Sequence, residues 1–141
     1  MGDVELPNIK VKLAILHAKD TKPEELSRWG KVFYQEGWLT DALLFFEKAK
    51  DQQRLAELRT RVVEEGDVFL FRQVQKAQNQ PAEGGEWQRI GDRALALGKW
   101  QFAWEAFRLA GNRKAMDAVH QLSHPLQEET PEPPAEGASS P

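Results

Sequence analysis

The sequence predicts an all-α protein built from antiparallel helical hairpins. Apolar residues recur at spacings of three and four through most of the chain, which places them on one face of a helix. The segment 26–50 also returns later in the chain as 87–111. Because one unit of this size cannot bury its apolar face alone, the duplication predicts hairpins that stack on one another.

Residues 1–22 are predicted to contain a helix. Asn8 is suited to cap a helix whose apolar face begins at Ile9 and extends to Leu16. The same stretch alternates between apolar and polar residues, which is also the pattern of a strand. We favour the helix because the rest of the chain is helical and no neighbouring segment offers a strand partner.

The first hairpin is predicted over 23–36 and 39–50. Thr21 and Glu24 resemble a capping box at its start, with Pro23 at the first helical position.

Two apolar stripes define the helices of this hairpin. The first stripe consists of Leu26, Trp29 and Phe33, and the second of Leu39, Ala42, Leu43, Phe46 and Ala49. Gly37 lies between them, where a helix C-terminus favours a residue that accepts positive φ. Gly30 and Ala42 are small, and they lie where two antiparallel helices can approach closely.

These residues resemble the tetratricopeptide repeat, whose pattern is W-x2-L-G-x2-Y followed by A-x3-F and a later Ala. The first copy supplies Leu26, Trp29, Gly30, Phe33, Gly37, Leu39, Ala42, Phe46 and Ala49, and the second supplies Trp87, Ile90, Gly91, Gly98, Trp100, Ala103, Phe107 and Ala110. Ala94 departs from the pattern, which has a large ring there, and Arg54 and Ala115 replace the closing Pro. The resemblance covers about half the chain and implies a short right-handed solenoid. Related α-solenoids of vesicle-coat and ciliary-transport subunits remain alternatives.

The middle of the chain predicts a third and a fourth helix that match the repeat poorly. The third spans 51–65, with Leu55, Leu58, Val62 and Val63 inward. Gly66 ends it, and Asp67 caps a fourth helix that extends to about Gln78. The run 68–71 is continuously apolar, which predicts a helix covered on most sides.

A second hairpin follows, predicted over 84–97 and 100–110, with a final helix over 112–122 that packs Ala115, Met116 and Val119 inward. The last residues hold five of the eight prolines, a composition that predicts disorder. The expected divisions are an N-terminal segment 1–22, a hairpin with a degenerate pair 23–78, a linker 79–85, a second hairpin with a capping helix 86–124, and a tail 125–141.

Composition narrows the class of protein. The chain has 19 Lys and Arg against 22 Asp and Glu, a net charge of −3, and this near-balance gives no electrostatic footprint for nucleic acid. It has no cysteine, so it forms no disulfide framework. No signal pattern or membrane-length apolar run is present, which favours a cytoplasmic protein without membrane insertion.

No constellation of residues predicts catalysis or a cofactor. His120 and His124 have the spacing of two ligands on one helix face, but the only other histidine, His17, lies far from them in the sequence. No serine lies in a nucleophile elbow, and no glycine run has the spacing of a phosphate loop. We therefore expect no enzyme activity, no cofactor and no metal.

The middle pair carries Arg54, Arg59, Arg61 and Arg72. A solvated face is the simpler interpretation of this basic cluster, and a patch for an acidic peptide or a phosphate is the alternative.

In tetratricopeptide proteins the first helix of each hairpin lines a concave, peptide-binding groove. The resemblance places in that groove Ser27, Lys31, Tyr34, Gln35, Gln88, Asp92 and Leu95. Ser27 and Gln88 stand where chaperone-binding members of the family use Lys or Asn to clamp a carboxylate, and Asp92 adds a like charge. We therefore expect no such clamp.

Phe45 and Phe102 lie at second-helix positions that often face outward, so they are candidate exposed anchors for a partner or for self-association. Burial against the middle pair or an end helix is the alternative.

The predicted function is a non-enzymatic scaffold or adaptor that binds a peptide or a partner domain. One alternative is a terminal fragment of a larger α-solenoid subunit with a structural role in assembly. Another is a helical regulatory domain that senses a small ligand or a metal.

Overall fold

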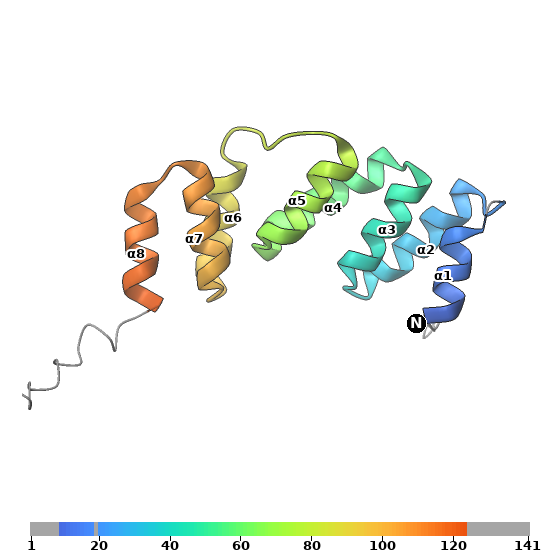
Figure 1. Cartoon of the computed structure of the whole chain (residues 1–141), viewed down its shortest axis with the longest axis horizontal. Helices are drawn as coiled ribbons and strands as arrows, with labels where there is room; N and C mark the ends of the chain where they lie inside the picture. The colour runs from blue at the N-terminus through green and yellow to red at the C-terminus, as the bar shows by residue number, and fades with distance from the viewer. Residues whose placement is uncertain (1–8, 19, 124–141) are drawn as a thin grey trace, which may run out of the picture.

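The computed structural model describes residues 9–18 and 20–123, and within these ranges the chain is all-α. Eight helices follow one another in a row from the N-terminal to the C-terminal end (Figure 1). They are α1 (Ile9–His17), α2 (Pro23–Gln35), α3 (Leu39–Ala49), α4 (Gln52–Glu65), α5 (Val68–Gln78), α6 (Glu86–Ala96), α7 (Trp100–Ala110) and α8 (Arg113–Ser123). Consecutive helices pack as pairs, most extensively α2 with α3 and α6 with α7. The predicted all-helical hairpin architecture is confirmed at this level.

The N-terminal segment is helical, as favoured over the strand. Leu16 of α1 is buried in the core, and Lys12 forms an ion pair with Asp41 of α3. The expected cap, Asn8, lies outside the described residues, as do the predicted tail 125–141 and His124.

The capping box predicted at Thr21 is wrong. Helix α2 has Lys22 as its N-cap, and no side chain caps it. The reason is Pro23, which occupies the first turn and restricts the residue before it to extended backbone. Lys22 accordingly has φ −74° and ψ 149°.

The helix ends predicted at Gly37, Gly66 and Asp67 form, and Asp51, predicted as the first residue of the third helix, is instead its N-cap. Gly37 and Gly66 adopt φ of 84° and 65°, values that a residue with a Cβ rarely adopts. The Asp51 carboxylate accepts a hydrogen bond from the Arg54 backbone N–H at 3.1 Å and caps α4. The Asp67 carboxylate caps α5 in the same way.

Two glycines allow the helices of a hairpin to approach closely. A Cβ built on Gly30 would lie 2.5 Å from a ring carbon of Phe46, and one built on Gly91 would lie 2.5 Å from the corresponding carbon of Phe107. Both rings are almost fully buried. The same contact therefore holds α2 against α3 and α6 against α7, at matching positions of the two sequence copies.

The middle pair uses a different contact, and this contact overturns the solvated-face interpretation of Arg59. Arg59 is only 6% exposed, and its guanidinium lies 4.8 Å from the centroid of the Phe71 ring. Its Nε and Nη2 donate to the two carboxylate oxygens of Glu86 at 2.8 and 2.6 Å. A bidentate pair of this kind is the strongest geometry available to two charged side chains.

Arg59 also fastens the linker to the helices. Its Nη1 donates to the Gln78 side chain at 2.8 Å, and its Nη2 donates to the Pro81 carbonyl at 2.8 Å. Glu86 in turn accepts a hydrogen bond from the Glu83 backbone N–H at 2.7 Å. One buried ion pair thus fixes the path of residues 79–85, which arch over the helices in Figure 1.

The departure at Ala94 has a steric cause. A Cβ built on Gly66, at the end of α4, would lie 2.6 Å from the backbone nitrogen of Ala94. The backbone of α4 therefore ends directly against α6, and the large ring that Phe33 supplies in the first hairpin has no space here.

We expect Gly30→Ala and Gly91→Ala each to lower the free energy of unfolding by about 1–3 kcal/mol, because the added methyl overlaps a buried ring. Gly84→Ala, where no atom lies within 4 Å of the added carbon, should change it by less than about 0.5 kcal/mol. Urea denaturation measures all three. If both helix variants were stabilised, as an exposed helical Gly→Ala change would be, the close contact would be refuted.

We expect Arg59→Met to cost about 3–5 kcal/mol, because it leaves the Glu86 carboxylate buried without its partner. The double variant Arg59→Met with Glu86→Leu should recover part of this loss. Arg54→Met, which removes an exposed pair with Glu57, should cost less than about 0.5 kcal/mol. Equal losses for Arg59→Met and Arg54→Met would contradict the assigned role of the buried pair.

The pair also predicts a dependence on pH. The hydrogen bonds from Arg59 lower the pKa of Glu86, although burial opposes the shift. A carboxylate with a lowered folded-state pKa stabilises the protein above its unfolded pKa of about 4.3, and this contribution disappears as the pH falls through the folded pKa. The free energy of unfolding should therefore fall more steeply below about pH 4.5 in the wild type than in Glu86→Gln. Parallel curves between pH 3 and pH 7 would show that the pKa of Glu86 is not lowered.

Candidate functional site

The polar residues predicted to face a peptide groove partly serve the packing of the helices. The Ser27 hydroxyl donates to the Asp51 carboxylate at 2.7 Å, and the Gln88 amide oxygen accepts from Asn112 at 3.1 Å. Asp51 and Asn112 are the residues that precede α4 and α8. Ser27 and Gln88 thus connect each hairpin to the helix that follows it.

The other predicted groove residues lie on α2 and α6, and most of them are polar. The exposed ones are Lys31, Gln35 and Asp92, and the partly buried ones are Tyr34 and Leu95. Tyr34 lies under the Arg61 guanidinium, 5.3 Å from ring centroid to Cζ. A hollow of about 550 Å³ between α2 and the start of α4 includes Ser27 and Lys31, but it contains no aromatic side chain.

The expectation that Phe45 is an exposed anchor is wrong. Its ring is fully buried and stacks on Phe33 with 5.3 Å between centroids. Phe102 is partly buried, and it lines a groove on the opposite part of the chain.

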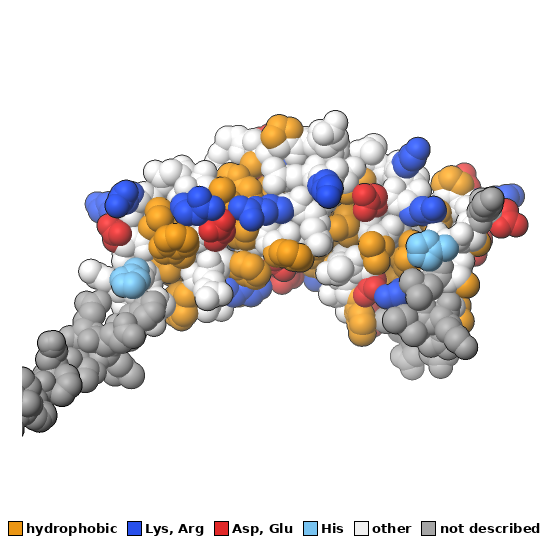
Figure 2. All heavy atoms as spheres, in the orientation of Figure 1, with side chains coloured by type: hydrophobic (Ala, Val, Ile, Leu, Met, Phe, Trp, Pro, Cys, Tyr) orange, Lys and Arg blue, Asp and Glu red, His pale blue; other side chains and the backbone are white. Residues whose placement is uncertain are grey.

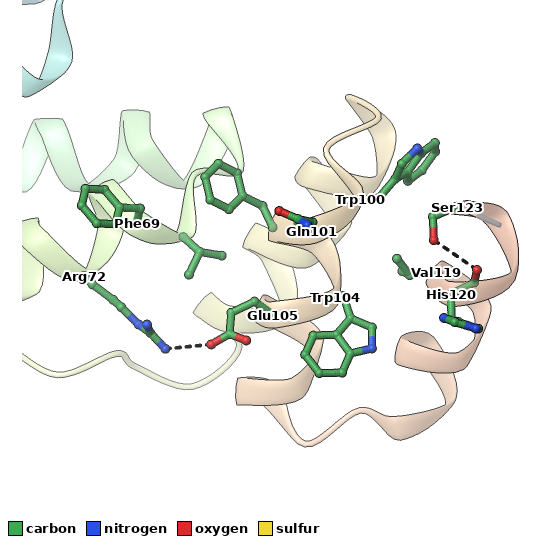
Figure 3. A pocket seen from close by; sticks show the side chains of 11 residues that line it. Phe69, Arg72, Trp100, Gln101, Trp104, Glu105, Val119, His120 and Ser123 are labelled. Atoms are coloured by element: carbon green, nitrogen blue, oxygen red, sulfur yellow. Dashed lines mark hydrogen bonds and ion pairs between the residues drawn. The ribbon is translucent and has the colours of Figure 1, made fainter.

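This groove, which we call the aromatic groove, has a volume of about 700 Å³. Side chains from α5, α7 and α8 line it (Figure 3). Figure 2 shows hydrophobic side chains on this part of the surface with basic side chains beside them. Its lining includes Phe69, Arg72, Trp100, Trp104, Glu105 and Val119.

Three large rings of the aromatic groove are exposed. Trp100 and Trp104 are 38% and 39% exposed, and Phe69 is 65% exposed. The run 68–71 is covered on most sides, as predicted, because Phe69 is the one exposed residue of the four. Trp100 and Trp104 project from α7 on the side of α8 (Figure 3). Clustered exposed rings on a folded protein are typical of a surface that contacts another molecule.

The corresponding residues of the first hairpin are buried. Leu39 and Leu43 hold the positions in α3 that Trp100 and Trp104 hold in α7, and they are only 9% and 4% exposed. Helix α3, which carries them, packs against α5. On the described residues, no helix follows α8 to cover α7 in the same way.

At the edge of the aromatic groove, two arginine side chains pair with one carboxylate. Glu105 accepts hydrogen bonds from Arg72 of α5 at 3.0 Å and from Arg108 of its own helix at 2.6 Å. The bond from Arg108, with a smaller effect of Arg72, lowers the pKa of Glu105 below its usual value, so this group is ionised at neutral pH. Two cations against one carboxylate leave the edge positive.

The predicted basic cluster is therefore not one patch. Arg59 is buried, Arg54 and Arg61 pair with Glu57 and Glu65 on their own helix, and only Arg72 reaches the aromatic groove.

The described residues contain no group of three His, Asp or Glu side chains arranged to hold a metal ion. Among the same residues, no helix is long and apolar enough to cross a membrane.

Sequence reasoning missed the aromatic groove, although the signal was present. Comparison of the two copies shows Leu39 and Leu43 replaced by Trp100 and Trp104. A change from Leu to the larger, amphipathic Trp at two positions of one face indicates a different neighbour, since Trp is enriched where a surface is partly wet.

Comparisons with models of known protein families, with curated proteins and with solved structures found no match.

Proposed function

We propose that the chain is a non-enzymatic protein-interaction module, a short stack of tetratricopeptide-like hairpins that binds a partner through the aromatic groove. The observation that carries the proposal is the exposure of Trp100 and Trp104 at positions whose counterparts, Leu39 and Leu43, are buried.

Physical arguments favour the aromatic groove over the polar surface of the first helices. Binding energy at protein interfaces comes mostly from a few Trp, Tyr and Arg side chains that are desolvated in a pocket. The aromatic groove offers Trp100, Trp104 and Arg72 together. Ser27 and Gln88, by contrast, already hold intramolecular hydrogen bonds that a ligand would have to replace.

A preformed scaffold also suits this role. The helices beneath the aromatic groove are held by the buried contact between Gly91 and Phe107 and by Val119. A rigid surface loses little conformational entropy when it binds, so more of the contact energy appears as affinity.

The second candidate is the end of a larger α-solenoid assembly. Helix α8 begins after Asn112, which caps it as Asp51 caps α4. This favours α8 as the first helix of a further hairpin, whose second helix another chain would supply. In that case the aromatic groove is an assembly surface.

The test is affinity capture with the purified protein, followed by titration of the captured partner against defined variants. Trp104→Gln should weaken binding about 30-fold, the effect of losing about 2 kcal/mol at a central aromatic anchor. Trp38→Gln is the matched control, because Trp38 is 55% exposed and lies outside the aromatic groove. Equal affinity for the wild type and Trp104→Gln would place the partner elsewhere and overturn the proposal.

A further inference from the structure

We infer that the occupant of the aromatic groove is a single amphipathic helix of a partner protein, with an apolar stripe and an acidic edge. It takes the position beside α7 and α8 that α5 takes beside α3 and α4. This inference rests on the proposed function and names the kind of partner it requires.

The first support is that α8 follows the second hairpin in the same sequence register in which α4 follows the first. The Asn112 side chain accepts from the Ala115 backbone N–H at 3.0 Å, as Asp51 accepts from Arg54 at the matching position after the first hairpin. Val119 of α8 is buried, and so is its counterpart Leu58 of α4. Helix α8 therefore matches α4 at its cap and at one buried position of the register.

The sequence does not favour a helix of this chain in the register that α5 occupies. When the two copies are superposed, the span of α5, 68–78, falls on 129–139. This stretch carries Pro131, Pro133 and Pro134. Each proline in a helix interior costs about 3 kcal/mol, because it removes a backbone donor and clashes with the preceding turn. Residues 129–139 are therefore not expected to form a helix in this register.

The shape of the aromatic groove restricts the apolar stripe of the occupant. Trp100 and Trp104 are larger than their buried counterparts Leu39 and Leu43, so a helix packed at a similar distance needs small residues opposite them. The chain shows this pairing internally, where the Phe46 and Phe107 rings fill the space left by Gly30 and Gly91. An occupant with Ala or Gly opposite the two indoles repeats that solution.

The positive edge of the aromatic groove indicates the charge of the residues that flank the apolar stripe of the occupant. Arg72 and Arg108 share the single carboxylate of Glu105, and Figure 3 shows Arg72 of α5 reaching toward Glu105 of α7. An acidic residue flanking the apolar stripe would compensate the remaining positive charge. Such an exposed contact favours orientation and association rate more than affinity.

The experiment selects displayed peptides of random sequence, each long enough for about four helical turns, on the immobilised full chain. Binders are counter-screened on Trp104→Gln, with Trp38→Gln as the control and melting curves to show that each variant is folded. We expect enriched peptides to carry apolar residues at i, i+3, i+4 and i+7, with Asp or Glu beside them. Synthetic copies should gain helical circular dichroism on binding, and Trp104→Gln should weaken them by about tenfold or more.

Arg72→Gln should weaken the same peptides about threefold at low salt and by less at high salt, because an exposed charge contact is screened. An effect of Arg72→Gln that does not depend on salt would refute the acidic edge.

Other outcomes overturn the inference in distinguishable ways. Peptides that depend on Trp104 but tolerate a central proline would show an extended occupant, so that the helix is refuted while the proposed function stands. Light scattering that shows a dimer lost in Trp104→Gln would identify a second copy as the occupant. Enrichment of no peptide that depends on Trp104 would refute the helix. Only a captured partner that ignores Trp104 refutes the proposed function as well.

Discussion

The contact between a helical glycine and a phenylalanine ring sets the geometry of this chain. Gly30 admits the edge of Phe46, and Gly91 admits Phe107, at a separation that no side chain on either glycine would allow. Because interiors are packed as densely as crystals, such a contact fixes both the distance between two helices and their relative register. This contact also positions the other apolar residues of each hairpin, including the exposed Trp100 and Trp104.

The middle pair shows that the same architecture tolerates a different solution. Arg59 lies over the Phe71 ring, and its charge is compensated by Glu86 on α6. A buried ion pair contributes less net stability than its Coulomb energy suggests, but its hydrogen bonds are directional. Here they join α4, the linker and α6, so the pair defines the path of the chain between the hairpins. The middle pair matches the repeat pattern poorly because these contacts of Arg59 stand in place of the glycine–phenylalanine contact of the two hairpins.

Periodicity and local signals were sufficient to predict every described helix, because apolar spacing, Asp51, Asp67 and the glycines act within a few residues. Contacts between residues far apart in the chain could not be predicted from the sequence. Arg59 looked like a solvated base, since nothing local indicates that the distant Glu86 would face it. The sequence left the burial of Phe45 and the exposure of Phe69 undecided for the same reason. Both lie in apolar stretches, and only the arrangement of neighbouring helices decides that Phe45 is buried and Phe69 is exposed.

The aromatic groove arises from the same packing of helical hairpins that builds the fold. In stacked hairpins the outer face of one unit is buried under the next, and repeat proteins usually close the terminal face with a polar capping unit. Here α8 buries Val119, yet Trp100 and Trp104 remain exposed beside it. Tryptophan tolerates this position because it combines a large apolar ring with a polar N–H, which suits a surface that alternates between water and a partner. Within the described residues, Trp100 and Trp104 thus stay exposed at positions whose counterparts in the first hairpin, Leu39 and Leu43, are buried.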